Sequence, residues 1–224
     1  MIKGRISEVF DSIQGEGIYV GESQIFVRFF GCNLSCGFCD TKLKDFSEYA
    51  PNELFEEIKN YQGAYHSVAF TGGEPLLQKD FLKEVSLRTS LQGYRNYLET
   101  NGTLPGELEE VIDYMDIVAM DLKLPSSTVQ DPMWREHKDF LKIASRKEVF
   151  LKAIICLSTT EEDLREALSL IKGSGVSAIL VLQPNSFEHS VRMDRKLKRF
   201  KDICFKEGTI ACVIPQAHKL IGVR

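Results

Sequence analysis

Three cysteines lie within one short stretch, Cys32-Asn33-Leu34-Ser35-Cys36-Gly37-Phe38-Cys39. Their spacing, C-x3-C-x2-C, lets three thiolates bind three of the irons of a [4Fe-4S] cluster, and the fourth iron then has no protein ligand. The amino and carboxylate groups of S-adenosylmethionine (SAM) can chelate such an open iron. One electron from the cluster would then cleave a C–S bond of SAM and leave a 5′-deoxyadenosyl radical.

A zinc site is the alternative for the same cysteines. Structural zinc usually takes four ligands, often as two spaced pairs. The histidines at positions 66, 137, 189 and 218 are all distant in sequence from the cluster of cysteines, although one of them could still supply a fourth ligand. The ligand count favours iron–sulfur over zinc.

The elements that would position these thiols alternate between strand and helix character. Strands are expected over 3–10, 24–30, 67–71, 95–99, 116–121, 148–155, 177–182 and 209–213. Helices are expected over about 51–61, 78–90 and 106–114, within 132–145, from a start in 158–162 to about 172, and over about 189–206. This alternation predicts an α/β fold with a parallel sheet. Roughly six β-α units are too few for a closed eight-unit barrel, so we expect one domain over 1–224, an open, partial β/α barrel. An N-terminal strand and loop extension would carry the cysteines.

Polar motifs follow the expected strands at their carboxyl ends, where parallel α/β folds gather their active sites. The segments concerned are 32–41, 71–75, 99–103, 121–123 and 183–184.

Composition excludes several other classes of protein. The chain has 224 residues and a formal net charge of −4, so no global basic field would attract nucleic acid. No run approaches the ~20 apolar residues of a membrane span, and no apolar block follows residues 1–5 as in a secretory signal. Cys156, Cys204 and Cys212 are scattered through apolar surroundings, which favours a reducing, cytoplasmic setting over a disulfide scaffold.

Two motifs together resemble the signatures of the radical SAM enzymes. The first is the cysteine stretch with an aromatic residue, Phe38, before Cys39, and the second is Thr71-Gly72-Gly73-Glu74-Pro75. Many members carry tryptophan where this chain has Phe38, a change that should keep the aromatic packing. The resemblance implies a partial six-unit barrel and both cofactors, the [4Fe-4S] cluster and SAM.

The chain as a whole is similar to the 7-carboxy-7-deazaguanine synthase family. The similarity rests on the block Gln14-Gly15-Glu16-Gly17 before the cysteines, on Arg28, and on segments 40–41, 99–102, 121–123 and 215–219. It implies a lyase that contracts the ring of 6-carboxy-5,6,7,8-tetrahydropterin to 7-carboxy-7-deazaguanine with loss of ammonia. SAM would be regenerated and Mg²⁺ would assist. The product would feed 7-deazapurines such as queuosine, a tRNA modification. A homodimer and a reducing protein such as flavodoxin or ferredoxin are also implied.

The resemblance carries site residues onto this sequence. Cys32, Cys36 and Cys39 would hold the cluster, and Thr41 would bind Mg²⁺. SAM would contact Phe38, Cys39, Asp40, Gly73, Glu74, Asp121, Lys123 and Ser126. The substrate would contact Ile13, Gln14, Gly15, Arg28, Thr71, Glu99, Gln183, His218 and the carboxylate of Arg224. No catalytic side chain is assigned, because the radical arises at the cluster and SAM.

Two alternatives stay open at this point. A glycyl-radical-enzyme activase uses the same cysteine spacing but needs a surface that docks a partner protein. A zinc-containing binding module would have no catalysis at all.

Overall fold

The computed structural model describes residues 2–39 and 44–222. Within this part of the chain nine strands form one sheet, in the order β3-β1-β2-β4-β5-β6-β7-β8-β9. β1 pairs antiparallel with β2 and β3, and all pairs from β2 to β9 are parallel. The strands are β1 (Gly4–Ile13), β2 (Ser23–Phe29), β3 (Ser47–Tyr49), β4 (Ser67–Gly72), β5 (Asn96–Thr100), β6 (Ile117–Asp121), β7 (Glu148–Ile155), β8 (Leu180–Pro184) and β9 (Ala211–Val213). Since β3 and β9 stand at opposite ends of this order, the expected open, partial β/α barrel is confirmed.

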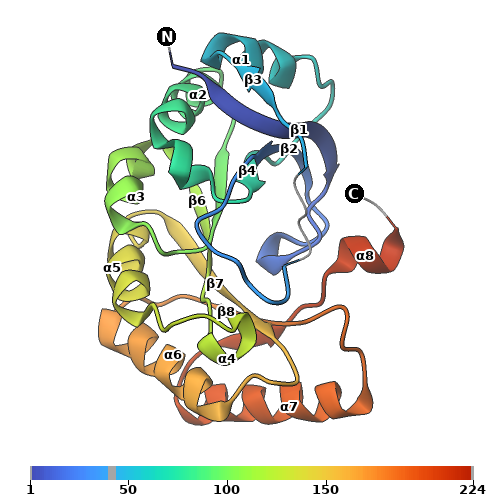
Figure 1. The fold of residues 1–224 in the computed structure, drawn as a ribbon, viewed down its shortest axis with the longest axis vertical. Coiled ribbons are helices and arrows are strands. Elements are labelled where there is room, and N and C mark those ends of the chain that lie inside the picture. Colours follow the sequence, from blue (N-terminus) through green and yellow to red (C-terminus); the bar gives the residue numbers. More distant parts are fainter. Residues whose placement is uncertain (1, 40–43, 223–224) are drawn as a thin grey trace.

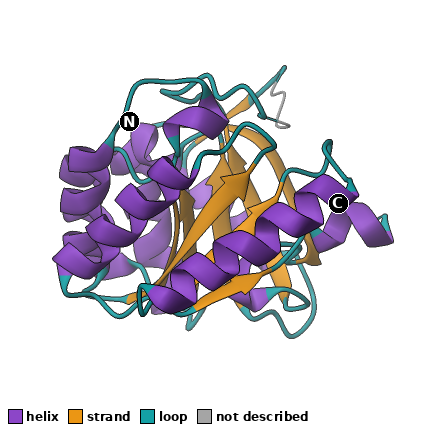
Figure 2. Cartoon of the chain, turned by 90° about the horizontal axis from the view of Figure 1, so that it is seen from below, coloured by secondary structure: helices purple, strands orange, loops and turns teal. Residues whose placement is uncertain are grey.

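Helices cover the outer side of the curved sheet (Figure 1), and Figure 2 shows them beside the strands from below. They are α1 (Pro51–Lys59), α2 (Lys79–Leu91), α3 (Pro105–Val111), α4 (Pro125–Thr128), α5 (Trp134–Ala144), α6 (Glu161–Ser174), α7 (Val191–Lys206) and α8 (Ala217–Ile221). They are accompanied by the 3-10 turns η1 (Gly17–Tyr19), η2 (Pro75–Gln78) and η3 (Ile112–Tyr114). α8 lies apart from the others, across the opening of the sheet (Figure 1). No helix in the described residues is both long and apolar enough to cross a membrane.

The strands are buried on both faces, which explains their nearly continuous apolar sequences. Along β2, Ile25 and Val27 belong to the large core between sheet and helices, while Phe26 points to the opposite face. That inner face carries a second core that includes Tyr97 and Phe150. The concave side is therefore filled with aromatic rings toward the amino ends of the strands, and this packing supports whatever lies at their carboxyl ends.

The turn η1 closes the inner face from the N-terminal side. Gly17 has a φ of 68°, and a Cβ placed on it would lie 2.5 Å from an atom of the Phe150 ring, so only glycine fits here. Tyr19 follows and makes an edge contact with Tyr97 at a centroid distance of 5.9 Å. Through these contacts the loop that carries Gln14 is held against the sheet.

Several expected boundaries differ from the observed ones. The strand expected over 177–182 is β8, Leu180–Pro184, because α6 ends at Gly175 in a left-handed conformation and pairing with β7 begins only at Leu180. Gln183 and Pro184 consequently belong to the strand rather than to the loop after it. The first strand continues to Ile13, and α4 and α8 are short helices that the periodicity did not predict.

Candidate active site

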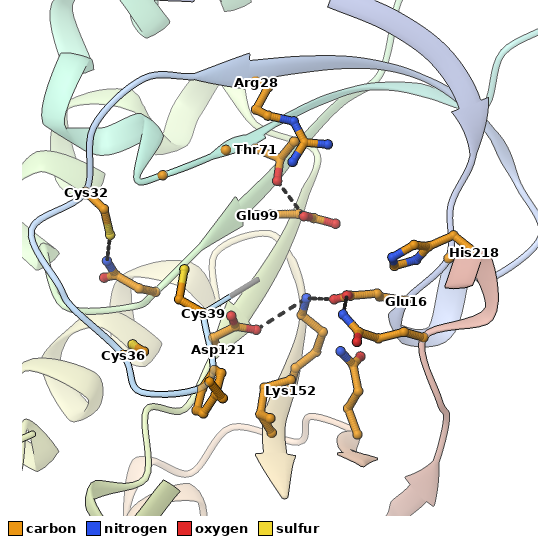
Figure 3. A pocket seen from close by; sticks show the side chains of 18 of the residues that line it. Glu16, Arg28, Cys32, Cys36, Cys39, Thr71, Glu99, Asp121, Lys152 and His218 are labelled. Atoms are coloured by element: carbon orange, nitrogen blue, oxygen red, sulfur yellow. Dashed lines mark hydrogen bonds and ion pairs between the residues drawn. The ribbon is translucent and has the colours of Figure 1, made fainter. Parts of the chain in front are cut away.

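A cavity of about 810 Å³ opens at the carboxyl ends of the parallel strands. Its walls come from the loop after β2, from the ends of β4 to β8, and from α8 (Figure 3). Fifteen of the predicted site residues line it: Ile13, Gln14, Gly15, Arg28, Cys32, Cys36, Phe38, Cys39, Thr71, Gly73, Glu99, Asp121, Lys123, Gln183 and His218. The expected convergence of the strand ends on one site is therefore observed. Glu74 and Ser126 do not line the cavity, and Asp40, Thr41 and Arg224 lie outside the described residues.

The three cysteines of the loop are free thiols that line one wall of this cavity. The loop is fastened from outside, because the Gly37 N–H donates to the Thr128 carbonyl at 2.9 Å. From the β5 side the Asn101 side chain donates to Asn33 Oδ1 at 2.8 Å. Burial raises the pKa of the Cys36 thiol, so metal binding there would release a proton. In the described part of the chain no three His, Cys, Asp or Glu side chains converge on one ion position. The donor set fits an iron–sulfur cluster, in which each thiolate binds a different iron.

The turn after β4 presses directly on the start of the cysteine loop. The Gly73 and Glu74 amides donate to the carbonyls of Phe29 and Gly31, at 3.0 and 2.8 Å. A Cβ on Gly73 would lie 1.9 Å from the Gly31 carbonyl oxygen, so the two backbones can approach this closely only without a side chain.

Replacing Gly73 with alanine is expected to displace the cysteine loop and to cost about 1–3 kcal/mol of unfolding free energy through overpacking. Urea unfolding of the metal-free chain and the iron content after anaerobic reconstitution measure the two effects. Gly106→Ala in α3 is the matched control, since its Cβ would meet nothing within 4 Å. Wild-type stability and iron content in Gly73→Ala would contradict the tight approach.

Glu74 lies beneath the cavity wall rather than in it. The buried carboxylate accepts hydrogen bonds from the Leu76 amide at 3.1 Å, from the Thr100 hydroxyl at 2.9 Å and from the Asn101 amide at 2.7 Å. Burial outweighs these donors and raises the pKa of Glu74 to about 7. The side chain thus ties the turn after β4 to the end of β5, while Thr71, Gly72 and Gly73 are the residues of the motif that line the cavity.

Ser126 also supports the wall from behind. Its amide donates to Asp163 Oδ2 at 2.7 Å, and its hydroxyl contacts the same oxygen, so the start of α4 is joined to α6. Asp121 and Lys123, by contrast, line the cavity. Lys123 Nζ lies 2.7 Å from Asp121 Oδ2 and 5.6 Å from the centroid of the Phe38 ring, which places a cation between β6 and the cysteine loop.

Glu16 and Lys152 join this site although neither was predicted to. Lys152 Nζ lies 2.7 Å from Glu16 Oε2 and 3.4 Å from Asp121 Oδ1, and its side chain is only 5 % exposed (Figure 3). Burial opposes the charge on both partners. Lys152 nevertheless lowers the pKa of Glu16 to about 2, while Asp121 and Glu16 raise the pKa of Lys152 well above its usual value. The sequence signal was present, since Lys152 is a charged residue within an otherwise apolar strand end.

The opposite wall of the cavity is polar and is organised around Glu99. Gln14 Nε2 donates to Glu99 Oε1 at 2.9 Å, and the Thr71 hydroxyl donates to Glu99 Oε2 at 2.7 Å. The three side chains come from β4, β5 and the loop after β1, and they meet only in the folded chain. A carboxylate held in this way presents acceptor oxygens to the cavity.

α8 completes the cavity on this side. The Ala217 amide donates to the Gly15 carbonyl at 2.8 Å, and a Cβ on Gly15 would lie 2.0 Å from His218 Nδ1. The Gln216 side chain donates to Glu16 Oε1 at 2.6 Å. Gly15 is therefore required for the close contact between the N-terminal block and α8, some 200 residues later in the sequence.

Arg28 lies at the mouth of the cavity and is already partnered. Its Nε is 3.3 Å from Glu8 Oε2, and its guanidinium carbon lies 5.4 Å from the centroid of the Phe10 ring. Stacking fixes the plane of the guanidinium group. The remaining N–H groups of the fork are the ones that an anionic ligand could use.

Comparisons with known proteins agree with this arrangement. Residues 26–171 match the family model described as the Radical SAM superfamily. A 7-carboxy-7-deazaguanine synthase of Geobacter sulfurreducens is 31% identical, over 97% of this chain and 96% of that protein. One from Archaeoglobus fulgidus is 32% identical over 100% of both chains. The crystal structure of QueE from Escherichia coli superposes with a TM-score of 0.66 at 18% identity, covering 95% of this chain and 94% of that one, and supports the fold.

Family match and relatives thus extend over the cysteine loop, the turn after β4 and the whole length of the barrel. The chain belongs to the radical SAM superfamily and, within it, to the family of the 7-carboxy-7-deazaguanine synthases.

Proposed function

We propose that this protein is a 7-carboxy-7-deazaguanine synthase. It converts 6-carboxy-5,6,7,8-tetrahydropterin into 7-carboxy-7-deazaguanine with loss of ammonia, and the product supplies 7-deazapurines such as queuosine. The observation that carries the proposal is a single cavity with three thiols on one wall and an oriented Glu99 on the other. The three thiols would hold the cluster that supplies radical chemistry, and Glu99 would hold a flat, polar substrate in the same cavity.

Membership of the radical SAM superfamily implies a [4Fe-4S] cluster and SAM. Cys32, Cys36 and Cys39 would hold the cluster, and Gly73, Phe38, Asp121 and Lys123 would surround SAM. When bound, this pair supplies the 5′-deoxyadenosyl radical that takes a hydrogen atom from the substrate, and SAM is regenerated afterwards. Glu74 and Ser126 act on this half of the site by holding its walls, through the bonds described above.

The wall of the cavity around Glu99 would bind a heterocycle that is rich in hydrogen-bond donors. Glu99 accepts from the amino and ring N–H groups of the pterin, and Gln183 and His218 border the ring. Arg28 would bind the substrate carboxylate, and Thr41 would hold Mg²⁺, which would supply a second positive charge for an anionic substrate. Arg224 and the backbone of Ile13 and Gly15 would complete the binding.

Replacing Arg28 with alanine is expected to weaken substrate binding about 10- to 100-fold while leaving SAM binding unchanged, because a charge-assisted hydrogen bond contributes about 1.5–3 kcal/mol. Dissociation constants for both ligands, measured anaerobically, check this. Arg165→Ala, which removes an exposed ion pair with Glu207, is the control. Equal loss of both affinities would instead make Arg28 a structural residue.

The proposal also includes the electron donor, the oligomeric state and the location of the enzyme. A reducing protein such as flavodoxin or ferredoxin supplies the electron, and a homodimer is the working state. The chain acts as one domain over 1–224, in the cytoplasm, where its thiols stay reduced.

Product identification by mass tests the function directly. The reconstituted, reduced enzyme is incubated anaerobically with SAM and 6-carboxy-5,6,7,8-tetrahydropterin, and 7-carboxy-7-deazaguanine with one equivalent of ammonia is expected. Absence of any deazapurine, together with formation of a glycyl radical on a partner protein, would establish the activase instead. That alternative is not favoured, since relatives that match over 97% of the chain are synthases.

A further inference from the structure

Behind Glu99 lies a buried pair of glutamines, Gln14 and Gln24, which are 2% and 0% exposed. Gln24 stands on β2 and does not line the cavity. Because Gln24 is fully buried, its polar side chain is costly unless both its oxygen and its nitrogen are hydrogen-bonded. Both are: Gln24 Oε1 accepts from Gln14 Nε2, and Gln24 Nε2 donates to Ser67 Oγ, each at 2.9 Å.

The serine that accepts from Gln24 also contacts a histidine outside the cavity. Arg95 Nη1 lies 2.9 Å from His66 Nε2, and a guanidinium group can only donate, so Nε2 must accept. Burial, followed by the charge of Arg95, lowers the pKa of His66 and keeps the ring neutral. The proton therefore sits on Nδ1, which donates to Ser67 Oγ at 3.0 Å.

The orientation of the two amides is fixed at the end of this chain of hydrogen bonds that faces the cavity. Gln14 Oε1 accepts from the Glu16 amide at 3.0 Å, so its oxygen cannot turn toward Glu99 without losing this bond. Both N–H groups of Gln14 are then used, one toward Gln24 and the other toward Glu99 Oε1. A flipped Gln24 would face Gln14 with donor against donor. Only one arrangement of the two amides satisfies every partner.

We propose that Gln24 is a positioning residue for substrate recognition: by holding the Gln14 amide in one orientation, it fixes Glu99 so that its oxygens accept the donor edge of an aminopyrimidinone ring. This inference rests on the proposed function and adds to it a residue that never touches the substrate. Without Gln24 one buried N–H of Gln14 loses its acceptor, and the amide is held only by its bonds with the Glu16 amide and Glu99, so its position against Glu99 is less well fixed.

The test compares Gln24→Leu with the wild type as unreduced, cluster-containing protein. The affinities measured are those for SAM, for 6-carboxy-5,6,7,8-tetrahydropterin, and for the analogue in which an oxo group replaces the 2-amino group. Gln24→Leu should bind the pterin about tenfold more weakly and discriminate less against the oxo analogue, with SAM affinity within twofold of wild type. Ile25→Val, which removes one methylene-sized group from the opposite face of β2, is the matched control and should bind all three ligands like the wild type.

Two further variants keep the proposal falsifiable. In a Glu99→Gln background the effect of Gln24→Leu should vanish, because it runs through Glu99. Ser67→Ala removes only the hydroxyl that accepts from Gln24, and it should weaken pterin binding about threefold. This variant serves as the test if Gln24→Leu does not fold.

Unchanged pterin affinity and discrimination in the variants, parallel loss of SAM affinity, or an effect that persists without Glu99 would each overturn the inference. These outcomes are separable from a failure of the proposed function, in which the wild-type protein itself neither binds nor converts the pterin, and the inference falls with it.

Discussion

Replacing Cys36 with alanine is expected to abolish both the iron–sulfur cluster and all turnover. The residue stands between Cys32 and Cys39 on the wall of the cavity, and three thiolates are the minimum that leaves only one iron open. With two thiolates, a second iron lacks a protein ligand. Iron and sulfide content, visible absorbance and product formation after anaerobic reconstitution measure the loss.

The control is Cys212→Ala, which removes a free thiol from the edge strand β9. It should keep the wild-type iron content and activity, because that thiol lies away from the cavity wall. Intact absorbance and full activity in Cys36→Ala would refute the assignment of the ligands.

The second large effect is expected on stability, from Lys152→Met. Lys152 carries the ammonium group shared by Glu16 and Asp121. Its removal leaves the buried Glu16 carboxylate without its counter-charge, while Asp121 keeps the shorter ion pair with Lys123. Breaking a buried ion pair from one side typically costs about 3–5 kcal/mol. Urea unfolding of the metal-free protein at pH 7 measures this change in unfolding free energy.

The dependence on pH follows from the lowered pKa of Glu16, about 2 in the folded protein against a usual value of 4.5. The paired Glu16 contributes stability that is fully present above pH 4.5 and is lost as the pH falls toward 2. The difference in unfolding free energy between wild type and Lys152→Met should therefore narrow as the pH is lowered from about 4.5 toward 2.

Two further variants test whether the unpaired buried charge is the cause of the lost stability. Lys152→Met combined with Glu16→Gln should recover part of the lost stability, because the unpaired buried charge is removed as well. Lys138→Met on the exposed side of α5 should stay within about 0.5 kcal/mol of wild type. A Lys152→Met protein as stable as the control would mean that the buried charges contribute nothing.

Local chemistry in the sequence was enough to place the cysteine loop, the Gly73 turn and Glu99 on one edge of a sheet. Each of these follows a strand whose apolar run is visible by itself, and parallel strands align their carboxyl ends. The extent of β8 was less predictable. Pairing with β7 continues through Gln183 and Pro184. A glutamine followed by a proline is typical of a loop, so the sequence alone does not show that both residues pair with β7.

Roles inside the site depended more strongly on the fold. Glu74 has the same sequence context whether its carboxylate faces a cofactor or the Thr100 hydroxyl, and only the packing of β5 against the turn places it below the wall. Gln14 carries the donors expected for a substrate contact, yet both are taken by Gln24 and Glu99. Glu16 finds its lysine on a strand that begins more than 100 residues later.

Residue types and spacing, by themselves, determined the class of chemistry, the open α/β barrel and the edge of the sheet at which the site lies, because ligand number and strand periodicity are local properties of the chain. The tertiary structure alone decided which polar groups face the cavity and which face one another. Hydrogen bonds and ion pairs are short-range, so a side chain's role depends on neighbours that the sequence brings together only when the sheet curves and α8 crosses its opening.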